Sequence, residues 1–125
     1  MLANRNAMAT IAVKDLAAAK KFYEGTLGLT PQQATEEGVL TYQSGTATVV
    51  VYVSQFAGTN QATSCTWGVG DEFDKIMQAL KARGVVFEHY DMPGMALQGD
   101  AHVAGDFKGA WFKDPSGNIL HILNQ

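Results

Sequence analysis

The hydrophobic and polar positions near the start of the chain predict a short strand followed by a helix. The strand is expected over residues 7–13, and Asp15 is placed to cap the helix, because its carboxylate can accept hydrogen bonds from free N–H groups of the first turn. Gly28 fits the left-handed position just beyond the helix end. Apolar residues recur near helical spacing between these two points, at Leu16, Ala19, Phe22, Tyr23 and Leu27. Three short strands are expected next, at about 30–35, 39–44 and 47–54.

The same order of elements returns in the second part of the chain. The stretch "SCTWGVGDEF" again reads as a strand that runs into an acidic cap, here Asp71. The apolar residues of the following helix keep the i, i+3, i+4, i+7 spacing, at Phe73, Ile76, Met77 and Leu80. Gly84 is expected to end this helix as Gly28 ends the first. Strands are expected near 85–90, 107–113 and 118–124.

This return indicates an internal duplication. Three pairs of residues with equal structural roles match at one constant offset: Val13 with Val69, Asp15 with Asp71 and Gly28 with Gly84. Three matches are weak evidence by count, but their shared roles favour a duplicated βαβββ unit. We therefore expect a single α+β domain over residues 1–125, with module one at about 7–54 and module two at about 62–124.

The second copy carries an extra segment, "DMPGMALQGDAHVAGD", at residues 91–106. It is rich in Gly and Met and has no clear period, so an irregular loop is expected there. Long irregular insertions in compact domains are often binding loops or lids. We expect this loop to be mobile without ligand and to become ordered on binding, with His102, like His89, at the surface.

The chain closes on "AWFKDPSGNILHILNQ", in which a turn at 114–117 joins two strands. Asp114 is expected to cap this turn rather than to act as an acid or base. His121 then lies in the middle of an apolar strand. Three roles remain open for it: a satisfied buried group, a hydrogen-bond partner of a ligand, or a general base.

Composition narrows the classes of function. The chain has 125 residues, of which 46% are hydrophobic and 17% are charged, so it can bury a sizeable core. The net charge of −3, without a cluster of Lys or Arg, argues against a nucleic-acid partner. The longest apolar run, residues 49–53, is far shorter than the roughly 20 residues of a membrane span. The N-terminal stretch lacks the apolar core of a signal peptide, and Cys65 has no disulfide partner, so a cytoplasmic location is expected.

Two of these stretches, "IAVKDLAAAKKFYEGTLGL" and "WFKDPSGNILHI", resemble the vicinal oxygen chelate superfamily of glyoxalases, bleomycin-resistance proteins and extradiol dioxygenases. The resemblance covers nearly the whole chain. It implies two βαβββ modules that curl into half-barrels with the helices outside. It also implies a homodimer, in which the cupped sheets enclose one ligand pocket for each pair of modules.

The resemblance implies four metal-ligand positions as well, and these fall on Met8, Ser64, His121 and about Val49. Only the imidazole of His121 is a good ligand for a zinc or iron ion, whereas thioether and valine side chains cannot replace the missing ligands. We therefore expect no metal and no other cofactor. A metal would need further ligands from the 91–106 loop, such as His102 or Asp100, or from a dimer partner.

Strand alternation predicts which side chains share the cupped face with His121. The expected ligand-binding set is small and mostly apolar, as is usual for small-molecule pockets: Met8, Thr10, Val49, Val51, Ser64, Thr66, Trp111 and His121. An ordinary filled barrel core is the competing interpretation. Trp67, which alternates with Thr66, is expected to pack under the helices.

Three functional hypotheses follow. The first is a protein that binds a small, partly apolar ligand in the cupped sheet and has a degenerate metal site, with no catalytic residue assigned. The second is a metal-dependent lyase, isomerase or dioxygenase with a non-standard metal site. The third is a structural or interaction module. The missing metal ligands favour the first hypothesis over the second.

Overall fold

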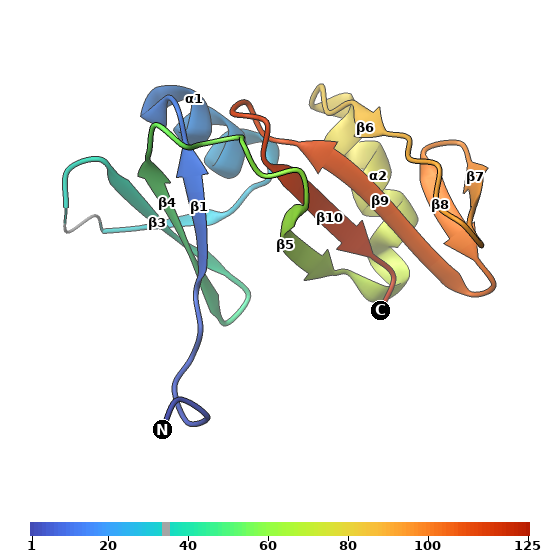
Figure 1. The fold of residues 1–125 in the computed structure, drawn as a ribbon, viewed down its shortest axis with the longest axis horizontal. Coiled ribbons are helices and arrows are strands. Elements are labelled where there is room, and N and C mark those ends of the chain that lie inside the picture. Colours follow the sequence, from blue (N-terminus) through green and yellow to red (C-terminus); the bar gives the residue numbers. More distant parts are fainter. Residues whose placement is uncertain (34–35) are drawn as a thin grey trace.

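The first half of the chain forms one mixed sheet with a helical segment on one face (Figure 1). The computed structural model describes residues 1–33 and 36–125. The elements of this half are β1 (Ala9–Val13), α1 (Leu16–Lys20), the π-helix η1 (Lys21–Thr26), β2 (Thr30–Gln32), β3 (Val39–Ser44) and β4 (Ala47–Val53). The sheet order is β1-β4-β3-β2, with β1 and β4 parallel. The far end of the strand expected at 30–35 lies outside the described residues.

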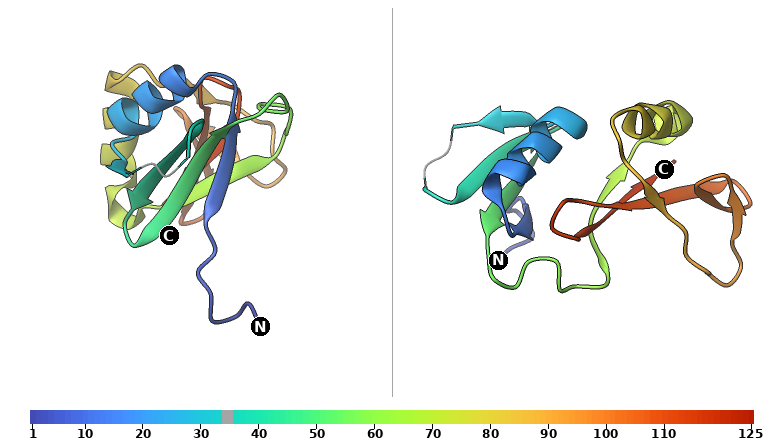
Figure 2. Two further views of the ribbon diagram at one scale, coloured as in Figure 1. Left: turned by 90° about the vertical axis from the view of Figure 1, so that its left-hand side faces the viewer. Right: turned by 90° about the horizontal axis from the view of Figure 1, so that it is seen from above.

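The second half repeats this arrangement with a larger sheet. Its elements are β5 (Thr63–Gly68), the 3₁₀ turn η2 (Gly70–Glu72), α2 (Phe73–Ala82), β6 (Phe87–Glu88), β7 (Ala96–Gln98), β8 (Ala101–Ala104), β9 (Phe107–Lys113) and β10 (Ile119–Leu123). The order is β5-β10-β9-β8-β7, with β5 and β10 parallel, and β6 pairs with the end of β9 that β8 leaves free. Both helical segments lie on the same side of the molecule (Figure 2). The α+β fold with outer helices is therefore confirmed. None of the described helices is long and apolar enough to cross a membrane.

The two helices begin differently. The prediction for Asp15 is confirmed, since its carboxylate accepts a hydrogen bond from the backbone N–H of Ala18 at 3.0 Å. The prediction for Asp71 is wrong, because Asp71 lies inside η2 and α2 begins only at Phe73. A 3₁₀ turn that starts at Gly70, with φ of +57°, separates the strand from α2 and moves the acidic side chain away from the first turn of the helix.

A buried polar network joins the two halves at the turn before β10. The carboxylate of Asp114 accepts hydrogen bonds from the hydroxyl of Tyr23 at 2.7 Å and from the side-chain amide of Asn118 at 2.8 Å. It also accepts from the backbone N–H groups of Ser116 and Asn118, as expected for a turn cap. The hydroxyl of Ser116 also links the two halves, because it accepts a hydrogen bond from the backbone N–H of Lys14. Burial and the neighbouring Asp114 carboxylate raise the pKa of Tyr23, which therefore stays a neutral donor.

The segment 91–106 is more regular than expected. It contains the hairpin β7–β8, and β8 pairs with β9 as part of the main sheet. Asp100, at the hairpin turn, bonds to the ammonium of Lys81 at 2.6 Å and to the ring of His89 at 2.7 Å. These two hydrogen bonds hold the pKa of Asp100 below its ordinary value. His89 is exposed as expected, but the prediction that His102 is exposed is wrong, because pairing of β8 with β9 buries it.

Candidate functional site

The register of β1 and β4 decides which side chains of the first sheet face away from the helices. Ile11 pairs with Val51 and Thr10 pairs with Val50. Paired residues of adjacent strands share a face, so Val51 lies with Ile11 in the buried core on the helix side. Val49, two residues before it, is also in that core. The prediction that Val49 and Val51 line the open face is therefore wrong.

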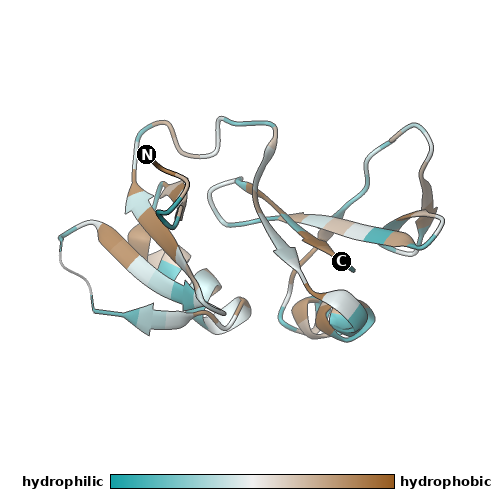
Figure 3. Ribbon diagram, turned by 90° about the horizontal axis from the view of Figure 1, so that it is seen from below, coloured by the Kyte–Doolittle hydropathy of each residue, from teal (hydrophilic) through white to brown (hydrophobic). Residues whose placement is uncertain are grey.

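Val50 and Tyr52 occupy the open face in their place, opposite Thr10 and Ala12. The error is a slip of one residue in the comparison of the two halves, and in a strand such a slip moves every side chain to the other face. Thr10 is exposed, as is Met8 just before β1. The alternation of hydrophobic and paler bands along these strands is visible in Figure 3.

The centre of the open face of the second sheet is a stacked pair of rings. His121 in β10 lies between Thr66 of β5 and Trp111 of β9, which are its register partners. The rings of Trp111 and His121 stack with centroids 4.1 Å apart and planes 9° from parallel. The Thr66 hydroxyl lies 3.4 Å from Nδ1 of His121. The structure thus brings together Thr66, Trp111 and His121 as the alternation predicts, and Ser64 is exposed in β5, two residues before Thr66.

Two further residues complete the cluster and were not predicted from the sequence. His102 of β8 meets the edge of Trp111 with ring centroids 4.9 Å apart, and Tyr90 lies 6.0 Å from both rings. Both residues belong to the region around the inserted segment, which has no periodic signal. Only the pairing of His102 with Gly109 across β8 and β9 places it on this face, and that long-range register cannot be read from a local pattern. We call Tyr90, His102, Trp111 and His121 the aromatic cluster.

The hydrogen bonding of His102 fixes its tautomer. Its Nε2 accepts a hydrogen bond from the backbone N–H of Tyr90 at 3.0 Å, so Nε2 carries the lone pair. In a neutral imidazole the other nitrogen then carries the proton. His102 therefore presents an Nδ1–H donor within the aromatic cluster.

Three buried polar atoms of this cluster have no hydrogen-bond partner among the described residues: Tyr90 Oη, His102 Nδ1 and His121 Nε2. Buried polar groups normally have partners, and leaving one without a partner costs about 1–3 kcal/mol. His121 is only 8% exposed, and burial, with a smaller effect of His102, lowers its pKa. The ring is therefore neutral at physiological pH and can either accept or donate one hydrogen bond at Nε2.

Gly109 makes room for the His121 ring. A Cβ atom added at Gly109 would lie 2.8 Å from Nε2 of His121 and 3.0 Å from the ring of Phe107. The absence of a side chain at this position lets the imidazole lean over the backbone of β9 toward His102.

Within a single chain, the side chains around His121 do not make a set of ligands that fits a metal ion. Met8, Ser64 and the valines of β4 supply no imidazole or carboxylate beside His121. His102 cannot act as a ligand through Nδ1 because that atom carries the proton. Within residues 1–33 and 36–125 no three His, Cys, Asp or Glu side chains gather closely enough to hold a metal ion.

Two helix-covered mixed sheets with a duplicated strand order and a partly polar open face define an α+β protein built from paired modules. The chain belongs to the Glyoxalase/Bleomycin resistance protein/Dioxygenase superfamily, whose family model matches residues 5–122. No curated protein sequence matches the chain.

Solved structures show the same fold at low identity. A glyoxalase family protein from Enterococcus faecalis is 17% identical, with a TM-score of 0.73 over 98% of this chain and 99% of that one. The fosfomycin resistance protein FosX from Mesorhizobium loti is 12% identical, with a TM-score of 0.70 over 98% and 92%. A lactoylglutathione lyase from Agrobacterium tumefaciens is 17% identical, with a TM-score of 0.70 over 97% and 94%. At these identities the likeness establishes the fold alone.

Proposed function

We propose that the protein binds a small, partly apolar ligand on the open face of the second sheet, without a metal ion of its own. The observation that carries this proposal is the set of buried polar atoms without partners in the aromatic cluster. A ligand oxygen next to Nδ1–H of His102 would satisfy one of them, and Nε2 of His121 would bond to a second ligand group. The faces and edges of Trp111 and Tyr90 supply apolar surface beside these polar atoms.

Access to the cluster requires movement, because Trp111 and His121 are each only 8% exposed. Residues 91–95 precede the hairpin and contain Pro93 and Gly94, the latter with φ of +81°. They form no strand or helix. We propose that this short segment opens to admit the ligand, while β8 stays paired with β9.

The open face of the first sheet extends the proposal from the single chain to a homodimer. Met8, Thr10 and Ser64 lie outside the aromatic cluster and are exposed in the single chain. In a homodimer the partner's first sheet would cover the second sheet and enclose the ligand. We therefore propose that these three residues contribute to the pocket from the rim.

Native mass spectrometry of freshly purified protein tests the proposal. We expect a retained small molecule, or in a thermal-shift screen of metabolites a stabilising ligand, and no stoichiometric metal ion. His121→Ala should weaken binding by about 1 kcal/mol, as loss of a hydrogen bond typically does. The fold should remain intact by circular dichroism.

Gly109→Ala provides a second, independent variant, because it displaces the His121 ring without removing the imidazole. It should also weaken binding. Gly25→Ala is the matched control, since a Cβ atom at Gly25 meets nothing within 4 Å. If the protein carries about one zinc, nickel or iron ion that is lost in His121→Ala, the metal-dependent enzyme replaces this proposal. Unchanged binding in both His121→Ala and Gly109→Ala would also exclude the aromatic cluster as the site.

A further inference from the structure

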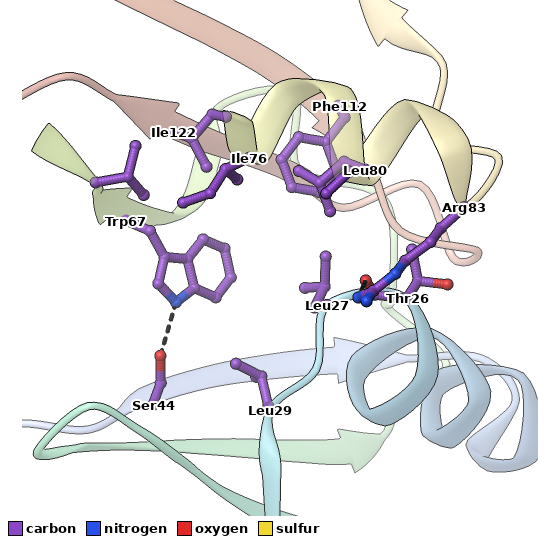
Figure 4. Close-up of a pocket in the computed structure, with 12 residues that line it drawn as sticks. Thr26, Leu27, Leu29, Ser44, Trp67, Ile76, Leu80, Arg83, Phe112 and Ile122 are labelled. Atoms are coloured by element: carbon purple, nitrogen blue, oxygen red, sulfur yellow. Dashed lines mark hydrogen bonds between the residues drawn. The ribbon is translucent and has the colours of Figure 1, made fainter. Parts of the chain in front are cut away.

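A cavity lies on the side of the sheets opposite the aromatic cluster, in the seam between the two halves (Figure 4). Its volume is about 280 Å³. Leu27 and Leu29 line it from the first half, and Trp67, Ile76 and Phe112 line it from the second. It shares no residue with the aromatic cluster, so it is independent of the function proposed above.

Hydrogen bonds between the halves fix the width of this seam cleft. At one end the indole Nε1–H of Trp67 donates to the hydroxyl of Ser44 at 2.9 Å. At the other end the guanidinium of Arg83 donates through Nη1 to the backbone carbonyl of Thr26 at 3.0 Å. Figure 4 shows these two pairs on either side of Leu27. Because both bonds connect the two halves, the cleft is already formed without a ligand, which reduces the cost of ordering on binding.

Arg83 gives the cleft a definite charge. The bond to Thr26 satisfies one nitrogen of the guanidinium and helps to cap the end of η1, which is a structural role. The guanidinium forms no ion pair with a carboxylate of the described residues, and Arg83 is one of the residues that line this mostly apolar cavity. Arginine binds carboxylates well in this setting, because its planar group can donate two parallel hydrogen bonds.

We propose that the seam cleft binds a small monocarboxylate whose apolar part is a single aromatic ring or a short branched chain. The carboxylate pairs with Arg83, and the apolar part lies between Leu27, Trp67 and Ile76. A cavity of roughly 150 Å³ lined by aliphatic and aromatic side chains holds benzene. The seam cleft, at about 280 Å³, therefore has room for one substituted ring.

Titration of the full-length protein with 3-phenylpropionate, followed by NMR of the two tryptophan indole N–H resonances, tests this proposal. Trp67→Phe and Trp111→Phe assign the two resonances. We expect the Trp67 resonance to shift in a saturable manner and the Trp111 resonance to stay in place. The neutral amide, 3-phenylpropionamide, should bind about tenfold more weakly, because it lacks the charge that pairs with Arg83.

Three variants separate this site from alternatives. Arg83→Met should weaken binding of 3-phenylpropionate about tenfold. Ala79→Leu should abolish binding, because Ala79 is an exposed lining residue of α2 and a larger side chain there fills the cleft while suiting a helix. His121→Ala should bind as the wild type does, since it alters only the opposite side of the sheet.

Four results would overturn the proposal. They are a saturating shift of Trp111 instead of Trp67, equal affinity for acid and amide, unchanged binding in Ala79→Leu, and no shift of either resonance at millimolar probe. Equal affinity for acid and amide would mean a purely apolar cleft. A Trp111 shift that is lost in His121→Ala would support the function proposed above while rejecting the seam cleft.

Discussion

The side chain of Tyr23 shows how one buried hydroxyl connects distant parts of the chain. It donates to Asp114, which is buried and lies 91 residues further along the chain. Tyr23→Phe removes this donor and leaves Oδ2 of Asp114 with Asn118 alone. Hydrogen bonds to charged groups contribute about 1.5–3 kcal/mol. We expect the free energy of unfolding, measured with urea, to fall by that amount.

Tyr52→Phe is the matched control for this change, because Tyr52 is 37% exposed and its hydroxyl, unlike that of Tyr23, forms no side-chain hydrogen bond among the described residues. It should change the free energy of unfolding by less than about 0.5 kcal/mol, because Phe keeps the ring and its apolar contacts. Equal destabilisation by the two variants would mean that the Tyr23–Asp114 bond adds nothing of its own.

The lowered pKa of His121 leads to a separate prediction, which concerns how the stability of the fold depends on pH. Burial lowers its pKa below the ordinary value of 6.5, so the folded protein resists protonation at this site. Above pH 6.5 both the folded and the unfolded ring are neutral and stability does not depend on this group. As the pH falls below that value, the unfolded chain takes up the proton first, so the folded state loses stability until the lowered pKa is reached.

We therefore expect wild-type protein to lose more thermal stability than His121→Gln between neutral pH and about pH 5. Differential scanning calorimetry across this range measures the effect. The carboxylates that titrate in the same range are common to both proteins, so the difference between the two curves isolates His121. If the difference in thermal stability between wild type and His121→Gln does not change with pH, the ring has the same pKa in the folded and the unfolded state.

At the scale of elements, the inserted hairpin divides into a fixed part and a movable part. β8 is paired on both sides, whereas residues 91–95 belong to no strand. Hydrogen exchange should be slow in β8 and fast over 91–95 in the absence of ligand. Asp100→Asn removes charged bonds to Lys81 and His89 and should speed exchange in β7 and the turn.

The effect of Asp100→Asn on the free energy of unfolding should stay below about 1 kcal/mol, because Lys81 and His89 are largely exposed. Asp106→Asn is the control, since Asp106 lies in the next turn and its carboxylate forms no ion pair among the described residues. Protection of residues 91–95 equal to that of β8 would contradict an opening segment.

The elements also show what the sequence could predict. Helix and strand positions follow from periodicity and from local signals such as Asp15 and Gly28, so most of them are confirmed. The prediction of which β4 side chains lie on the open face was wrong because it depended on aligning the two halves to within one residue. A shift of one residue reverses the face of every side chain in a strand, and Gly45 alone does not fix the alignment that closely. His102 and Tyr90 were missed for a different reason: their place in the site depends on strand pairs and ring contacts that are far apart in the chain or have no period.

At the scale of the whole molecule, a single chain leaves apolar surface uncovered on and beside the first sheet. Tyr52, on the open face of the first sheet, is 37% exposed, and Met8, just before β1, is 57% exposed. Such side chains, grouped on one sheet whose outer strand β2 has a free edge, are typical of an interface. We therefore predict a homodimer in which the partner covers this surface.

Light scattering coupled to size exclusion should give a mass twice the 13.4 kDa of one chain at tens of micromolar. Tyr52→Asp places a charge on the open face of the first sheet and should shift the protein toward the monomer, because an unpaired charge in an interface is costly. Val86→Asp is the control, since Val86 is 78% exposed and lies in the second half of the chain, just before β6. If the dimer encloses the ligand, Tyr52→Asp should also weaken ligand binding, whereas Val86→Asp should not. A wild-type monomer at these concentrations would rule out the enclosed pocket and leave the aromatic cluster to bind within one chain.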